Sequence, residues 1–170
     1  GAPGKVATPE TEEASSREFG GFRVLDMIGS GGMATVYKAL QVSVERMVAL
    51  KVLSPKLLKH KDQRERFHRE AKILATLSHP NIVQLIDFKS SEHFDFLVME
   101  YIEGPSLYDV MAGSWPEPAF YGSLVRQVAD ALAYLHARNV IHRDIKPTNI
   151  LMDRNRHVRL SDFGIALHMG

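Results

Sequence analysis

The chain has 170 residues, of which 45% are hydrophobic and 24% charged, with a formal net charge of +1 and no cysteine. This composition is typical of a globular domain rather than a disordered or fibrous chain, and the missing cysteines exclude disulfide scaffolds, cysteine–zinc sites, iron–sulfur clusters and thiol catalysis. The balanced charge predicts neither nucleic acid nor an anionic membrane as a partner, and no apolar run reaches the roughly 18–20 residues that a membrane span needs.

The first 20 residues differ in composition from the rest of the chain. Gly, Pro, Ala, Thr, Ser and Glu dominate them, and Phe19 is their one aromatic residue. Such a segment buries too little apolar surface to fold by itself. We therefore expect a disordered leader over residues 1–20, with residues 1–4 as a cloning scar.

Short apolar runs and one helix are predicted next. The runs are rich in Val, Leu, Ile and Phe and predict strands at residues 22–28, 35–40, 46–53, 82–88 and 94–100. Apolar residues spaced three and four apart predict a helix over residues 61–78. Its outward face is basic, which favours a solvated surface over a docking site.

Helices are predicted to dominate the second half of the chain. Gly104 and Pro105 mark a break. A short helix is expected over residues 106–112 with Ser106 as its N-cap, and a long helix over residues 118–137. Strand pieces at 150–152 and 157–160 follow. Strands first and helices second predict two subregions that meet near residues 100–104.

A glycine-rich loop lies between the first two predicted strands. Gly29, Gly31 and Gly32 fall within residues 28–36. Glycine lets a ligand approach the backbone, whose N–H groups can then face phosphate oxygens. The loop lacks the Gly-Lys-Ser/Thr of a Walker loop, and the strand after it excludes a dinucleotide-binding fingerprint. By itself it fits a ligand-free hairpin turn equally well.

Lys51 lies inside an otherwise apolar predicted strand. A lysine there must reach solvent or find a charged partner. Glu70, 19 positions later on the predicted helix, is the candidate partner for an ammonium aimed at phosphate. Two alternatives remain open: an edge-strand lysine that prevents aggregation, and an ordinary surface salt bridge.

The most specific signal is the segment over residues 141–151. Asp144, Lys146 and Asn149 lie within six residues, and Asp162-Phe163-Gly164 follows. A carboxylate, an ammonium and an amide together can accept a hydroxyl proton, neutralise a phosphoryl group and bind a metal ion. Carboxylate and amide oxygens suit Mg²⁺. Each piece taken alone is also typical of turns.

Together these motifs resemble the protein kinase family in order and approximate spacing, over residues 22–170. Lys146, two residues after Asp144, is the pattern of serine/threonine kinases. Further stretches are similar to bacterial kinases of the eukaryotic (Hanks) type: residues 31–33, 66–71 and 162–166.

The resemblance implies a protein-kinase-like α+β fold. A five-stranded N-lobe with one main helix, together with the hinge, would occupy residues 21–102. An incomplete, mostly helical C-lobe would occupy residues 103–170. The lobes would be aligned by an apolar stack of Leu74, Leu85, His142 and Phe163.

The resemblance also implies an ATP site between the lobes. Lys51, paired with Glu70, would contact the α- and β-phosphates, and Met99 would be the gatekeeper before a hinge at residues 100–102. The implied ATP-binding residues are Ile28, Gly29, Ser30, Gly31, Gly32, Met33, Ala34, Thr35, Val36, Ala49, Lys51, Met99, Glu100, Ile102, Ser106 and Leu151. Among them, Ser106 would meet the ribose, and Val36, Ala49 and Leu151 would enclose the adenine ring.

The implied activity is transfer of the ATP γ-phosphoryl group to serine or threonine hydroxyls of proteins. Asp144 would accept the hydroxyl proton and Lys146 would contact the transferred group. Asn149 and Asp162 would hold Mg²⁺ or Mn²⁺. The resemblance further implies a role in bacterial signalling and a cytoplasmic location, whether the parent protein is free or membrane-anchored.

Two features depart from the family pattern. Ala34 replaces the third loop glycine, a change that ATP binding should survive. The chain ends six residues after Gly164, so we expect the rest of the C-lobe to follow in a longer chain. The alternative is a nucleotide-binding half-kinase or pseudokinase-like module that does not turn over, and self-associates through the exposed face of the helix at 118–137.

Overall fold

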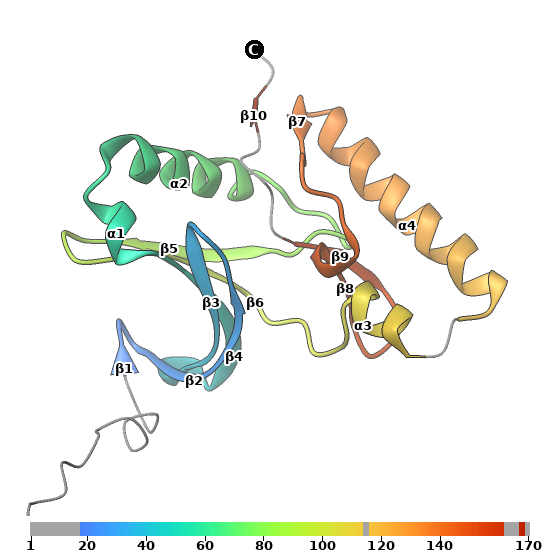
Figure 1. The fold of residues 1–170 in the computed structure, drawn as a ribbon, viewed down its shortest axis with the longest axis horizontal. Helices are drawn as coiled ribbons and strands as arrows, with labels where there is room; N and C mark the ends of the chain where they lie inside the picture. Colours follow the sequence, from blue (N-terminus) through green and yellow to red (C-terminus); the bar gives the residue numbers. More distant parts are fainter. Residues whose placement is uncertain (1–17, 114–115, 162–166, 169–170) are drawn as a thin grey trace, which may run out of the picture.

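The computed structural model describes residues 18–113, 116–161 and 167–168, which form two regions (Figure 1). We call them the sheet region, residues 18–100, and the helical region, from residue 104 onward. Their order confirms the predicted α+β class. Most of the predicted leader lies outside the described residues, but its end forms the strand β1 (Glu18–Phe19), so the folded region begins before residue 21.

All five predicted strands lie in one antiparallel sheet, and β1 adds a sixth at its edge, in the order β1-β2-β3-β4-β6-β5. The other strands are β2 (Phe22–Ser30), β3 (Ala34–Gln41), β4 (Arg46–Leu53), β5 (Leu85–Ser90) and β6 (Asp95–Glu100). The short 3-10 helix η1 (Val42–Val44) links β3 to β4.

Residues 82–84 were predicted as the start of a strand, but the sheet begins only at Leu85. The preceding segment turns to the helical region instead. Val83 N–H donates to the Leu160 carbonyl (2.9 Å), and Leu160 N–H donates to the Asn81 carbonyl (2.9 Å). Ile82 and Val83 are therefore buried at the junction of the two regions and not within the sheet.

Both faces of the sheet are covered by apolar groups. Phe96 and Val98 of β6 belong to one cluster, whereas Leu97 and Met99 belong to the other, as the two-residue period of a strand requires. On the first face, the Phe19 ring lies 4.4 Å from that of Phe94, centroid to centroid. Because β6 is buried on both sides, it shows a continuous apolar run without alternation.

The helix α2 (Lys61–Leu74), preceded by α1 (Pro55–Leu58), supplies the cover for the second face. Phe67, Ala71 and Leu74 of α2 are buried in the same cluster as Leu97. The helix ends at Leu74, four residues before the predicted end, because Thr76 and Leu77 form tighter three-residue turns.

The helical region places two helices beside small strands. Its elements are α3 (Leu107–Ala112), α4 (Pro118–His136), β7 (Val140–Ile141), the 3-10 helix η2 (Pro147–Asn149), β8 (Ile150–Met152), β9 (Val158–Leu160) and β10 (Leu167–His168). The predicted N-cap is confirmed, because Ser106 and Asp109 form a reciprocal capping box at the start of α3. No helix in the described part of the chain is long and apolar enough to cross a membrane.

Gly104 allows the chain to pass closely over β8 where the two regions join. A Cβ at this position would lie 1.9 Å from the Met152 carbonyl oxygen. We expect Gly104→Ala to lower the free energy of unfolding by about 1–3 kcal/mol, because backbone must move to relieve the overlap.

The matched control is Gly122→Ala within α4, where an added Cβ meets nothing within 4 Å. Alanine favours a helix over glycine, so this variant should gain about 0.5–1 kcal/mol. Urea unfolding of both variants measures the difference. Equal stabilities would contradict the close approach.

Candidate active site

Lys51 and Glu70 form an ion pair inside the molecule. Lys51 Nζ lies 2.8 Å from Glu70 Oε1, and the two side chains are 15% and 7% exposed. Lys51 is on β4, which is flanked by β3 and β6, so the edge-strand alternative is wrong. The low exposure also excludes a surface salt bridge. Because an enclosed ion pair costs desolvation, its presence needs a reason beyond stability.

The glycine-rich loop is a tight connection between β2 and β3. Ser30 pairs with Thr35 across the hairpin, and Gly31 N–H donates to the Ala34 carbonyl (3.0 Å). Gly32 does not have a positive φ, and a Cβ added there would meet nothing within 4 Å. Neither backbone conformation nor internal packing therefore requires glycine at this position, and the open space beside it is compatible with a ligand close to the backbone.

Ala34, which departs from the family pattern, fits its place without strain. It is the first residue of β3, pairs with Leu53 of β4, and is 8% exposed. Its φ is not positive, so its methyl group carries no steric penalty. The loop therefore accommodates alanine at this position, and the survival of ATP binding stays a prediction.

Predicted adenine-lining residues come from both regions. Val36 and Ala49 are half-buried on β3 and β4, and Ala49 pairs with the buried Met99 of β6. Leu151 of β8 forms an isolated bridge with Ser106, so it lies beside the chain that enters the helical region after residue 104. Within the described residues, the Ile102 backbone forms no hydrogen bond, so its N–H and C=O are open to solvent or to a ligand.

The hydroxyl of Ser106, predicted to meet a ribose, is engaged within the chain. It donates to Asp109 Oδ2 (2.7 Å) and accepts from Asp109 N–H (3.2 Å). The capping role is therefore the one that the geometry accounts for. A ribose contact by Ser106 would have to use the lone pair that remains on its oxygen.

The side chains of Asp144, Lys146 and Asn149, which lie within six residues of one another in the sequence, meet in the structure. The Asn149 amide nitrogen donates to both the main-chain oxygen and Oδ2 of Asp144, each at 2.9 Å. Lys146 Nζ lies 3.4 Å from the same Oδ2. Asp144 and Lys146 are 40% and 54% exposed, whereas Asn149 is buried. A buried amide thus orients a carboxylate that solvent and substrates can reach.

Buried His142 fixes the start of this loop. Asp144 N–H donates to His142 Nδ1 (3.2 Å), so the ring proton is on Nε2, which lies 2.9 Å from the Ser161 carbonyl oxygen. Ser161 N–H in turn donates to the Asn149 carbonyl (3.0 Å). The residue before Asp162 is therefore attached to the Asp144–Asn149 loop from two sides.

The donors expected for a metal ion are partly described. Asp162 lies outside the described residues, as does Phe163 of the predicted apolar stack. Both N–H groups of the Asn149 amide point to Asp144, so its oxygen is the atom left for a cation, and this donor fits Mg²⁺. The described residues contain no group of three or more His, Cys, Asp or Glu arranged for a metal.

Sequence reasoning missed Arg159 on β9. Its Nη1 donates to Glu100 Oε1 (3.3 Å), and the same oxygen accepts Gln84 N–H (2.9 Å). Glu100, the first predicted hinge residue, is thereby tied to the helical region. A single sequence contains no local signal for a pair 59 positions apart.

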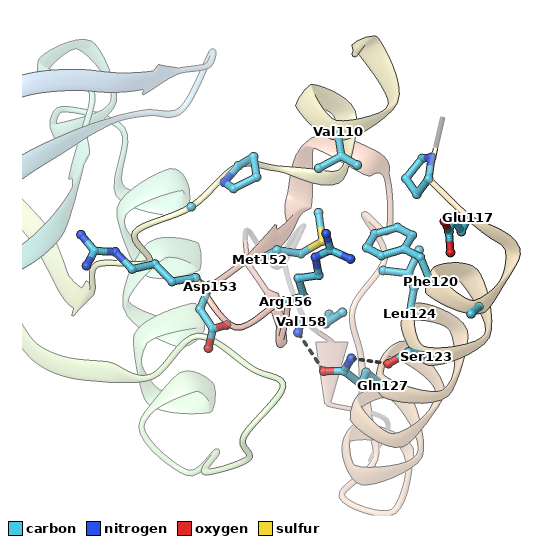
Figure 2. Close-up of a pocket in the computed structure, with 15 residues that line it drawn as sticks. Val110, Glu117, Phe120, Ser123, Leu124, Gln127, Met152, Asp153, Arg156 and Val158 are labelled. Atoms are coloured by element: carbon cyan, nitrogen blue, oxygen red, sulfur yellow. Dashed lines mark hydrogen bonds between the residues drawn. The ribbon is translucent and has the colours of Figure 1, made fainter. Parts of the chain in front are cut away.

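A pocket of about 930 Å³ lies within the helical region (Figure 2). It is enclosed by α3, α4 and the turn between β8 and β9. Val110, Phe120 and Leu124 line its apolar side, and Asp153 and Arg156 lie at the turn. It contains none of the predicted catalytic or metal-binding residues.

Comparison with known proteins gives independent evidence on the family of the chain. The protein kinase domain family matches residues 22–170. Serine/threonine-protein kinase pkn2 of Myxococcus xanthus is 45% identical over 150 residues, which are 86% of this chain and 18% of that protein. PrkC of Bacillus subtilis, also a serine/threonine-protein kinase, is 38% identical over 151 residues, which are 88% of this chain and 23% of that protein. The serine/threonine-protein kinase pkn3 of Myxococcus xanthus is 39% identical over 168 residues, which are 95% of this chain and 31% of that protein. The chain thus spans less than a third of the length of these relatives.

Proposed function

This chain belongs to the protein kinase family and is similar to bacterial serine/threonine kinases of the Hanks type, and we propose that it transfers the ATP γ-phosphoryl group to serine or threonine hydroxyls of proteins. The observation that carries the proposal is the convergence of Asp144, Lys146 and Asn149 on one another. A ligand-free turn needs no buried amide to orient an accessible carboxylate. The N-lobe with its hinge would comprise residues 21–102 together with the edge strand β1 at residues 18–19, and the C-lobe residues 103–170.

ATP would bind between the two regions. Its adenine would lie between Val36 and Ala49 on one side and Leu151 on the other, with the backbone at Ile102 reading its edge. Gly32 and its neighbours would let the loop approach the phosphates. Lys51 would neutralise phosphate charge, and Glu70 would hold the lysine in place, which supplies the reason for enclosing that ion pair.

Asp144 would orient the substrate hydroxyl and accept its proton as the oxygen attacks the γ-phosphorus. Lys146, close to the same carboxylate, would neutralise the transferred group. Asn149 and Asp162 would hold Mg²⁺ or Mn²⁺. When bound, that ion supplies charge neutralisation between the phosphates. We also propose a cytoplasmic location, where ATP and protein substrates are both present.

Two measurements test this function. Mg·ATP should raise the melting temperature of the chain, because a ligand at about 100 times its Kd adds about 2.7 kcal/mol to the stability of the folded state. Transfer of labelled phosphate to a generic basic protein should then be measured on this chain and on any longer natural form of it. Absence of a thermal shift at millimolar Mg·ATP would contradict nucleotide binding.

A second candidate function is a nucleotide-binding module that self-associates without efficient turnover. The observation in its favour is Val125, 64% exposed on α4, which forms the outer edge of the helical region (Figure 1). A second copy could cover this face. Light scattering decides: a mass of one chain at high concentration would remove this candidate.

A further inference from the structure

Asp95, the first residue of β6, is a fully buried carboxylate. Arg64 Nε donates to its Oδ2 (2.7 Å), and Arg64 Nη2 donates to its Oδ1 (2.9 Å). The Ser90 hydroxyl also donates to Oδ1 (2.7 Å), and His68 Nε2 lies 2.6 Å from Oδ2. A buried charge is tolerated only when it is paired and hydrogen-bonded, and both carboxylate oxygens here are engaged.

The partners of Asp95 join two elements. Arg64 and His68 lie four positions apart on α2 and so share one face of that helix. Asp95 and Ser90 belong to the β5–β6 hairpin, and Arg64 Nη2 also donates to the Ser91 carbonyl in its turn. The His68 ring packs edge-on against Phe88 of β5, with centroids 5.0 Å apart. The cluster therefore fixes α2 to the hairpin.

The same helix carries Glu70 to Lys51. At 1.5 Å of rise per residue, Glu70 lies roughly 3 Å along the axis from His68 and roughly 9 Å from Arg64. Apart from the Lys51–Glu70 pair itself, α2 packs on the described part of the sheet through apolar side chains such as Phe67, whose contacts are non-directional and allow a helix to slide or rotate. A two-pronged arginine–carboxylate pair, by contrast, specifies one orientation.

We propose that Asp95, through Arg64 and His68, is a positioning residue that holds α2 where Glu70 can reach Lys51. It touches neither nucleotide nor substrate, and acts on the proposed ATP site only through the helix. The expected effect on ATP binding rests on the proposed function, whereas the attachment of α2 rests on the geometry of the cluster alone.

Asp95 is ionised at neutral pH. Burial raises the pKa of its carboxyl group, but the hydrogen bonds from Arg64, Ser90 and His68 together lower it by more. The pKa therefore lies below its ordinary value of 3.8. The interaction with Arg64 is therefore that of a charged pair, and replacing the carboxylate by an amide of the same shape removes the charge without opening a cavity.

The test compares Asp95→Asn with Asp87→Asn in the whole chain. Asp87 lies on the neighbouring strand β5, but it is exposed and paired with Lys89 at the surface. Hydrogen exchange of the α2 amides should become at least 10-fold faster in Asp95→Asn, with α4 unchanged. Mg·ATP should bind about 10-fold more weakly, and Asp87→Asn should match the wild type in both measurements.

Arg64→Lys is the second variant, because lysine keeps the charge but not the two-pronged geometry. Arg64→Lys should also make the α2 amides exchange faster than in the wild type. It provides the test if Asp95→Asn does not fold. Unchanged α2 exchange in both variants, or faster exchange spread equally over α2 and α4, would overturn the proposal. A wild-type chain that binds no Mg·ATP would overturn the proposed function, while the exchange of the α2 amides would still show whether Asp95 holds α2 in place.

Discussion

Asparagine in place of Asp144 should slow phosphoryl transfer by about 10²- to 10⁴-fold, the range that a general base contributes. The amide keeps the shape of the carboxylate and an oxygen that can accept from Asn149, but it cannot take up the hydroxyl proton. Because Asp144 and Lys146 are both substantially exposed, their ion pair contributes little to stability, and the fold should be unaffected.

The measurement is the rate of labelled phosphate transfer, with the Mg·ATP-induced melting shift recorded in parallel. The shift should persist in Asp144→Asn, which separates loss of chemistry from loss of binding. Asp130→Asn, an exposed acid on α4, serves as the control and should transfer phosphate like the wild type. Equal rates for Asp144→Asn and the wild type would exclude Asp144 as the base.

Removal of Lys51 should be the most destabilising change at the site. Lys51→Met leaves the Glu70 carboxylate buried without its cation, and breaking a buried ion pair in this way costs about 3–5 kcal/mol. The double variant Lys51→Met/Glu70→Gln should recover most of that loss, because no uncompensated charge remains. Neither variant should show a Mg·ATP-induced melting shift.

Urea unfolding without nucleotide measures these free energies and yields the coupling between the two side chains. Lys61→Met is a matched control, since Lys61 and Glu65 form an exposed pair one turn apart at 3.9 Å. Its stability should not change measurably. If Lys51→Met were as stable as that control, Glu70 would not depend on Lys51, and the reason given for their burial would be wrong.

Local patterns were sufficient to predict most of the elements. Apolar runs located the strands, three-to-four spacing located α2 and α4, and Ser106 marked the start of α3. The same patterns could not show that residues 82–84 leave the sheet, since an apolar segment buried at the junction looks like a buried strand. Phe19 likewise gave no sign that it would close one face of the sheet.

The candidate site was predictable where its residues are close in sequence or match a family motif. Asp144, Lys146 and Asn149 satisfy the first condition, and Lys51 and Glu70 the second. Asp95 satisfies neither. It opens a strand buried on both faces, so no alternation shows that its side chain points inward, and its partner Arg64 is 31 positions away. Long-range polar pairing depends on tertiary structure that one sequence does not display.

The backbone hydrogen bonds from residues 81–83 to β9 have a consequence for how the two regions can move. They attach the segment between α2 and β5 to the helical region, so the two regions are joined at this segment as well as by the chain that leaves β6. A movement of one region relative to the other must therefore bend the chain at both places or break these hydrogen bonds. If a nucleotide binds between the regions, as proposed, both connections would limit how far the regions separate to admit it.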